Sequence, residues 1–397
     1  MEKEKKFISI DRKRGFELTT PLEQNRIQEF IRLFPPRKSI PLTQIFNEIN
    51  QTTGFLDRFE PFYSRRRSRK PDPLYFYAAL LSRTQRKRLK QLGKPFAKLE
   101  QRQLKETLQI YFTLESLKEA NRAVKSFVED LEIASLPETG FSQYSFTDKE
   151  NLFSRPTVLC CSATDFPYAL DLLLGNPAAP LEEGNLLIKK PMECVELLFG
   201  IAKLLGFAYA MRIKDFGKYT LYGFENTDSQ LKNFTPDGQI DAGVIEANWD
   251  EMLRFAVTIH TGHTPASILI PKFMNRFDDP LYLGIRELGR VQQTIFMLKY
   301  IDNLKLRQTI ETHWTKSKYH QKLSSLLQTP PKPSEFTSYQ DRELNAACKT
   351  LIQNCILAWN YLYLSKRMEE KSGGMKDFKK AIQSGFIPLG KHIDFSQ

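Results

Sequence analysis

Residues 248–300 read NWDEMLRFAVTIHTGHTPASILIPKFMNRFDDPLYLGIRELGRVQQTIFMLKY, and the interpretation of the whole chain starts from this stretch. Its apolar residues recur at helical spacing in two runs, which predicts two amphipathic helices around a compact turn region. The first run carries Trp249, Leu253, Phe255 and Ile259. The second carries Leu283, Ile285, Leu288, Val291, Ile295 and Leu298, with Arg286, Glu287 and Arg290 on its other face. Periodicity alone favours ordinary core packing for such a pair.

Three phrases in this stretch are more specific than their period. Residues 249–254 read WDEMLR, residues 262–267 read GHTPAS and residues 284–290 read GIRELGR. In this order and spacing they resemble the catalytic region of the Tn3 family, the replicative transposases of class II bacterial transposons. Further similar phrases lie at residues 53–59 (TGFLDRF), 354–364 (NCILAWNYLYL) and 387–395 (IPLGKHIDF), so the resemblance covers roughly residues 34–395.

Composition is that of a globular protein large enough for one large or two smaller domains. The 397 residues are 41% apolar and 12% aromatic. No apolar run approaches the roughly 18–20 residues needed to cross a bilayer, and the N-terminus lacks the apolar core of a signal peptide. The five cysteines show no CxxC pairing and suit a reducing compartment. We therefore expect a cytoplasmic protein with no membrane partner.

Positive charge is concentrated in one segment. The formal net charge is +12, and residues 58–102 hold fourteen Lys or Arg against three acids. Such a segment attracts polyanions and forms salt-dependent contacts with phosphate, which predicts DNA as a partner. A solvated basic helix surface and an acidic partner protein are the alternatives. The candidate DNA-binding residues are Arg65, Arg66, Arg67, Arg69, Lys70, Arg83, Arg86, Lys87, Arg88, Arg286 and Arg290.

The expected fold is α/β and mostly helical. Apolar spacing predicts helices within residues 40–62, 103–128 (two) and 341–368, and strands at 157–163, 186–188, 207–214 and 220–224. The resemblance implies that the strands are the remnant of an RNase-H-like sheet with flanking helices and a large helical insertion. Only nine residues separate Phe153 from Ala163, so the sheet is expected to be shortened. The predicted division is 1–138 (helical basic region), 139–225 (shortened core), 226–332 (helical insertion) and 333–397 (C-terminal helix and tail).

The resemblance also implies a catalytic site of three carboxylates that hold two Mg²⁺ ions for phosphoryl transfer. Asp148, after a strand-like run at 142–146, is the candidate for the first, although an aspartate beginning a turn is an equal alternative. The second and third positions carry Lys190 and Lys318, with Glu311 two helical turns before Lys318. Ammonium groups repel the cations that this site would hold. We therefore expect catalysis to be lost, and no cofactor to be bound.

Two other functions remain open at this point. An active transposase could use a rearranged site built from Asp148, Glu193 and Glu287. Against this, Glu287 is placed to form an ion pair with Arg286 or Arg290 on its own helix. A helical protein-interaction module is the third possibility. Expected partners are DNA, and a second copy of the chain or an intact transposase.

Overall fold

The computed structural model describes residues 8–11, 15–18, 28, 30–36, 38–62, 70–85, 92–131, 158–161, 166–174, 186–189, 195–224, 236–327, 339–370 and 389–395. The chain forms two compact units. Unit 1 contains residues 1–22 and 155–315, and unit 2 contains residues 23–154 and 316–397. The four-part division expected from the sequence stays a prediction.

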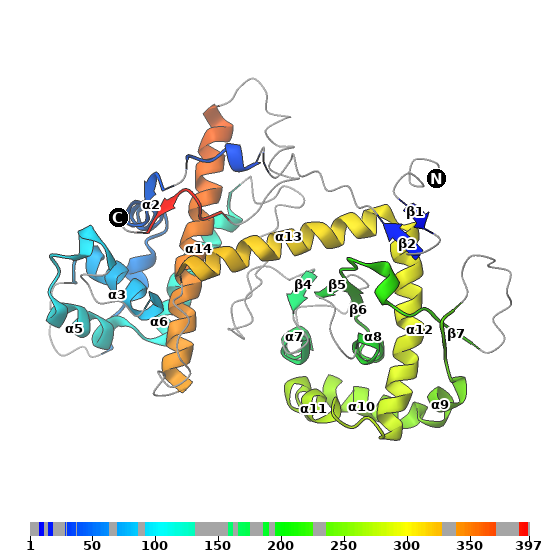
Figure 1. Ribbon diagram of the computed structural model, residues 1–397. Helices are drawn as coiled ribbons and strands as arrows, with labels where there is room; N and C mark the ends of the chain where they lie inside the picture. The colour runs from blue at the N-terminus through cyan, green and yellow to red at the C-terminus, as the bar shows by residue number, and fades with distance from the viewer. Residues whose placement is uncertain are drawn as a thin grey trace. The chain divides into compact units, whose positions relative to one another are not determined.

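Unit 1 is built on a small parallel sheet. Its strands β4 (Val158–Cys161), β5 (Leu186–Lys189) and β6 (Ala208–Met211) lie in that order, with Lys189 opposite Met211. Helices α7 (Phe166–Leu174) and α8 (Val195–Leu204) lie on one side of this sheet (Figure 1). The remaining strands of unit 1 are short: an antiparallel hairpin of β1 (Ile8–Asp11) and β2 (Gly15–Leu18), and a parallel pair of β7 (Tyr222–Gly223) and β8 (Gly238–Gln239). A strand lies within or over each of the predicted ranges 157–163, 186–188, 207–214 and 220–224, although β6 and β7 are shorter than predicted. Residues 142–146 lie outside the described ones.

The stretch that opened the sequence analysis forms three helices rather than two. They are α10 (Trp249–His260), α11 (Ala266–Phe273) and α12 (Pro280–Asp302), preceded by α9 (Ala242–Ala247). The prediction of a turn region between the two helices is wrong, because this region contains α11. The N-terminus of α11 is capped by a residue from a distant part of the chain, as described below. Phe255, Ile259 and Ile285 are buried as predicted. Trp249, Leu253, Ile295 and Leu298 are instead partly exposed, because helical period identifies an apolar arc wider than the face that the neighbouring helices cover.

Two glycines bring α8 and α12 into backbone contact. A side chain at Gly289 would overlap the carbonyl oxygen of Glu196, and one at Gly200 would overlap that of Ile285. Since only glycine leaves this space, each helix supplies one glycine to the crossing. The buried face of α12 accordingly runs through Ile285, Gly289, Phe296 and other residues on that side of the helix.

Helix α13 (Leu304–Leu327) follows α12 almost directly. Its fully buried Arg307 donates from Nη1 to the backbone oxygens of Tyr300 at 2.8 Å and Ile301 at 2.5 Å. A cation that binds the last carbonyl groups of a helix stabilises its C-terminus. The end of α12 is thereby tied to the beginning of α13.

Unit 2 is a helical assembly around α14 (Tyr339–Glu370). Its described helices include α2 (Leu42–Thr53), α3 (Pro73–Gln85), α5 (Gln101–Tyr111) and α6 (Leu114–Glu129). The two-residue strands β3 (Ile40–Pro41) and β9 (Ile393–Asp394) pair in parallel. Leu351, Ile352, Cys355 and Ile356 of α14 are fully buried. The helices predicted within 40–62, 103–128 and 341–368 are confirmed, and none of the helices in the described part is long and apolar enough to span a bilayer.

Candidate functional site

The carboxyl ends of β5 and β6 form the edge at which a parallel sheet of this kind places its polar groups. Arg212 follows β6 directly, and its Nε lies 2.5 Å from Oε1 of Glu311, a residue of α13. The side chain of Glu311 is buried and that of Arg212 nearly so. This carboxylate is therefore held in an ion pair inside the protein.

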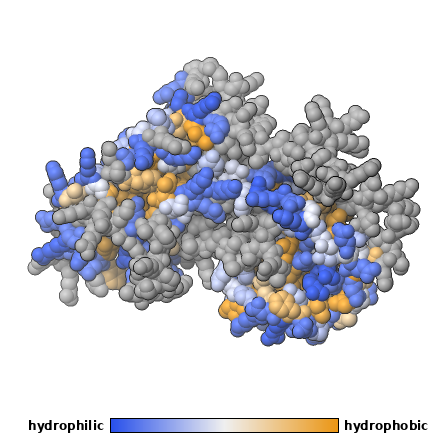
Figure 2. Space-filling model, in the orientation of Figure 1, coloured by the Kyte–Doolittle hydropathy of each residue, from blue (hydrophilic) through white to orange (hydrophobic). Residues whose placement is uncertain are grey.

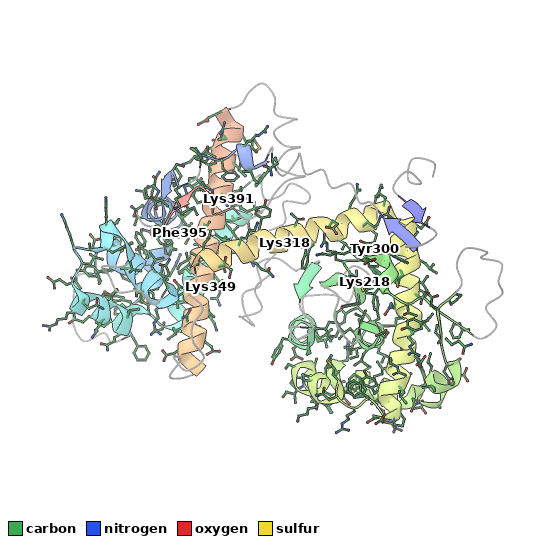
Figure 3. The ribbon with its side chains drawn as sticks, in the orientation of Figure 1. Lys218, Tyr300, Lys318, Lys349, Lys391 and Phe395 are labelled. Carbon is green, nitrogen blue, oxygen red and sulfur yellow. The ribbon has the colours of Figure 1, made fainter. Side chains whose placement is uncertain are left out.

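Aromatic groups surround this ion pair. The guanidinium of Arg212 lies over the ring of Trp314, 5.6 Å from its centroid. Tyr300, labelled near the end of α12 in Figure 3, donates its hydroxyl to the backbone oxygen of Ile213 at 3.3 Å. Burial, and then the charge of Glu311, raise the pKa of Tyr300 to about 12. Tyr300 is therefore a neutral hydrogen-bond donor at physiological pH.

The predicted triad positions are only partly described. Asp148, Lys190 and Glu193 lie outside the described residues. Lys318 is described, is exposed and projects from α13 (Figure 3). Among the described residues no group of three His, Cys, Asp or Glu side chains is placed to hold a metal ion.

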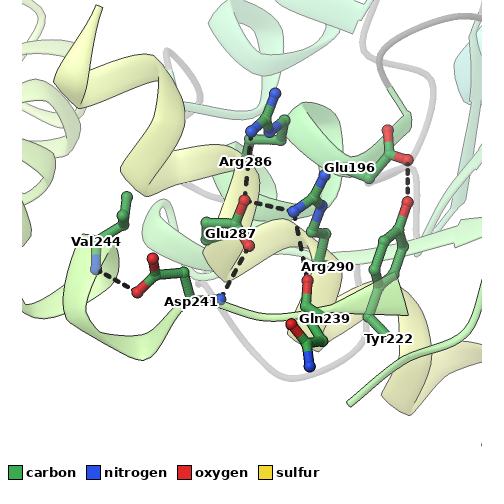
Figure 4. Close-up of polar contacts among 8 residues, drawn as sticks. All are labelled: Glu196, Tyr222, Gln239, Asp241, Val244, Arg286, Glu287 and Arg290. Atoms are coloured by element: carbon green, nitrogen blue, oxygen red, sulfur yellow. Dashed lines mark hydrogen bonds and ion pairs between the residues drawn. The ribbon is translucent and has the colours of Figure 1, made fainter. Parts of the chain in front are cut away.

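Glu287 lies at the centre of a buried polar cluster on α12 (Figure 4). Its Oε1 is 2.5 Å from Nη1 of Arg290 and 3.4 Å from Nη2 of Arg286, and its Oε2 accepts from the backbone nitrogen of Asp241 at 3.3 Å. The predicted ion pairs within this phrase are confirmed. The Glu287 carboxylate is therefore buried and paired with two guanidinium groups of its own helix.

Arg290 extends this cluster toward α8. Its guanidinium lies 4.8 Å from the centroid of Tyr222, whose hydroxyl donates to Oε1 of Glu196 at 3.0 Å. Burial, and then the neighbouring Glu196 carboxylate, raise the pKa of Tyr222. Arg286 and Arg290, both predicted to bind DNA, are thus ion-paired within the protein.

The two described DNA-binding candidates of the basic segment, Lys70 and Arg83, also have partners in the chain. Nζ of Lys70 donates to the backbone oxygen of Leu56 at 2.6 Å and lies 3.6 Å from Asp57. Arg83 pairs with Asp341 of α14 at 3.0 Å. The other predicted DNA-binding residues of this segment lie outside the described ones: Arg65, Arg66, Arg67, Arg69, Arg86, Lys87 and Arg88.

A contact between distant segments explains α11. Both carboxylate oxygens of Asp171, on α7, accept backbone N–H groups at the start of α11, from Ala266 at 2.6 Å and Ser267 at 3.1 Å. A carboxylate at this position satisfies free donors and complements the helix dipole. Sequence reasoning missed the pairing because 95 residues separate Asp171 from Ala266.

The sequence of the chain is similar to a known protein family and to several curated proteins. The model of the family described as Tn3 transposase DDE domain matches residues 44–140 and 137–396. The chain belongs to the Tn3 transposase family. Two of the curated transposases similar to it serve transposon Tn1546 of Enterococcus faecium, at 25% identity, and transposon Tn3926 of Escherichia coli, at 27%.

These relatives are much longer than the chain. The match to the Tn1546 transposase covers 95% of this chain and 41% of the relative, and the match to the Tn3926 transposase covers 50% and 21%. The Tn3-like phrases at residues 262–267 and 284–290 have clear structural roles in this chain. The first phrase contains Ala266, the start of α11, whose backbone N–H donates to Asp171. The second phrase contains Glu287, its partners Arg286 and Arg290, and Gly289, which contacts α8.

Proposed function

We propose that this chain is a DNA-binding Tn3-family protein, involved in transposition, that has lost strand cleavage and strand transfer. The observation that carries the loss of catalysis is the ion pair between Arg212 and Glu311 at the carboxyl edge of the parallel sheet. The Glu311 carboxylate is buried, and its charge is already paired with that of Arg212. Lys190 follows β5 and Lys318 lies on α13, at the positions that the family resemblance gives to carboxylates.

The three parallel strands support an interpretation as the remnant of an RNase-H-like sheet. In that interpretation β5 is the strand whose end would carry the second carboxylate, and Lys190 stands there instead. A magnesium pair does not fit these residues, because lysine offers a cation where an oxygen ligand is required. We therefore derive no catalytic step through a metal ion.

The alternative active site built from Asp148, Glu193 and Glu287 is weakened by the surroundings of Glu287. A metal ion would have to displace two arginines from a buried carboxylate, and the two freed guanidinium groups would repel it. The family membership favours DNA as a partner, and the excess positive charge of residues 58–102 supplies the means of binding it.

The first prediction concerns DNA binding. The affinity of the full chain for a short labelled duplex should fall steeply with salt, as measured by fluorescence anisotropy. In the double variant Arg65→Ala, Arg66→Ala, the slope of log affinity against log salt should decrease by about two, because each lost phosphate contact removes about one counterion. The loss should be similar for unrelated DNA sequences, since phosphate contacts do not read bases.

A matched control removes the same charge elsewhere. Arg122→Ala with Arg276→Ala changes two exposed arginines outside residues 58–102 and should leave the slope unchanged. Equal slopes for the wild type and the Arg65, Arg66 variant would remove the basic segment from the proposal.

Loss of catalysis is tested separately. The wild-type chain, incubated with Mg²⁺ and duplex transposon ends, should yield neither nicked nor joined strands on a sequencing gel. A metal-dependent product that disappears in Asp148→Asn would contradict the proposal and support a rearranged active site.

A further inference from the structure

One edge of α10 carries apolar side chains that the protein leaves in solvent. The neighbouring face of the helix is buried through Met252, Phe255, Ala256 and Ile259. Trp249, Leu253 and Val257 are 43%, 42% and 57% exposed, and we call these three residues the α10 stripe. Figure 2 shows hydrophobic surface gathered over α10 and α11 at the bottom of the view. Single exposed apolar residues are common, but a contiguous row on one helix marks an interaction surface.

The spacing of the stripe makes it complementary to itself. Its residues are four apart, so they form one continuous row along the helix. When two copies of α10 are set antiparallel about a twofold axis through Leu253, Trp249 of each copy faces Val257 of the other. The large indole then meets the smaller side chain, and Leu253 meets itself at the centre. A self-complementary patch of this kind is what a twofold dimer requires.

Charges beside the stripe follow the same symmetry. Asp250 and Arg254 lie on one flank, one helical turn apart, and both are exposed. In the antiparallel arrangement, Asp250 of each copy lies beside Arg254 of the other, so that two opposite-charge pairs form at once. Arg254 also pairs with Glu251 of its own helix, at 2.5 Å. Exposed pairs of this kind contribute little and exchange readily, so this contact does not prevent the exchange of partners.

We propose that a second copy of this chain covers the α10 stripe, with the two α10 helices antiparallel. Three partly exposed side chains on each copy form an interface well below the roughly 1,200 Å² of a standard specific complex. The dimer is therefore weak and concentration-dependent. The inference does not rest on DNA binding, and DNA-free protein is used to test it.

Sedimentation equilibrium of the full chain over a wide concentration range should show a monomer–dimer equilibrium. Leu253→Glu places two like charges at the centre of the interface and should raise the dissociation constant at least about tenfold. Ile295→Glu is the matched control, because Ile295 is 41% exposed and lies on α12 rather than on the stripe. It should leave the equilibrium unchanged. Thermal unfolding of each variant verifies that the monomer remains folded.

Charge reversal tests the antiparallel arrangement itself. Asp250→Arg or Arg254→Asp alone should weaken the dimer several-fold, because each turns two attractive pairs into two repulsive ones. The double reversal should restore the wild-type dissociation constant. A chain that remains monomeric at every concentration, or a dimer that Leu253→Glu does not weaken, would overturn the proposal. Failure of the double reversal to restore association would exclude the antiparallel pairing.

Discussion

Glu287 and Glu311 are two buried carboxylates whose partners lie at very different distances along the chain. The arginines of Glu287 lie one and three residues away, so the ion pair could be predicted from helical spacing. The partner of Glu311 is Arg212, 99 residues earlier, and no local pattern joins them. Sequence reasoning consequently identified the first pair and not the second. Each carboxylate needs its arginine, since an unpaired buried charge is strongly destabilising.

His392 leads to a prediction at this same scale. Its ring stacks against Phe34 and against Trp359, with centroids 5.2 Å from each, and its Nε2 is buried without a partner in the described part of the chain. Burial lowers the pKa of His392 from 6.5 to about 4. Above pH 6.5 both folded and unfolded chains hold it neutral. As the pH falls from about 6.5 to about 4 only the unfolded chain takes up the proton, so stability is lost in this window.

That loss should be on the order of 3 kcal/mol. It can be measured as the change in unfolding free energy between neutral and acidic pH in urea titrations. Other groups titrate as well, so the readout is the difference between the wild type and His392→Phe, which keeps an aromatic ring in the stack. Identical pH profiles for the two chains would show that His392 does not titrate as described.

At the scale of helices, periodicity located the elements but not their neighbours. The spacing in residues 248–300 predicted α10 and α12, and it correctly buried Phe255, Ile259 and Ile285. It missed α11, which depends on Asp171 for its cap. It also placed Leu253 and Ile295 in the core, because an apolar arc does not reveal which part of it a neighbouring helix covers. The contact of Gly200 and Gly289 was likewise invisible, since glycine carries no apolar signal.

The crossing of α8 and α12 should be sensitive to a single methyl group. In Gly289→Ala the new Cβ would overlap the carbonyl oxygen of Glu196, so the two helices must separate. We expect a loss of roughly 2–3 kcal/mol in unfolding free energy, despite the higher helix propensity of alanine. Chemical denaturation monitored by circular dichroism measures it.

The comparison variant is Gly243→Ala in α9, where the new Cβ would meet, among the described residues, a terminal oxygen of the Asp241 side chain. This change should be neutral or slightly stabilising. A similar small effect at both glycines would contradict the close backbone contact.

At the scale of the whole molecule, each of the two units is formed by two separate stretches of the chain. Unit 2 draws on residues 23–154 and 316–397, while unit 1 is largely the segment between them. Local composition does not show that α14 packs on α2, α3 and α6, which come about 200 residues or more before it in the chain. The buried aliphatic face of α14 is the reason for this packing, since leaving it and its partners in water would expose a large apolar area.

Truncation after Thr315 should therefore unfold residues far from the cut. Without α14, the helices α2, α3 and α6 lose the partner for their buried faces. Hydrogen exchange should show loss of protection across residues 38–131, while residues 195–302 in unit 1 stay protected. Retained protection across residues 38–131 would mean that this part folds independently of the C-terminal segment.

The glycine pair between α8 and α12 also bears on the history of the gene. Any change at the first or second base of a glycine codon introduces a side chain or a stop, and at Gly200 or Gly289 any side chain blocks the helix crossing. A reading frame drifting without selection would lose one of these codons as readily as any other. Sequencing of sister copies in related genomes would then distinguish drift from purifying selection: codons that vary only at silent positions at both glycines would mark a polypeptide still selected to fold.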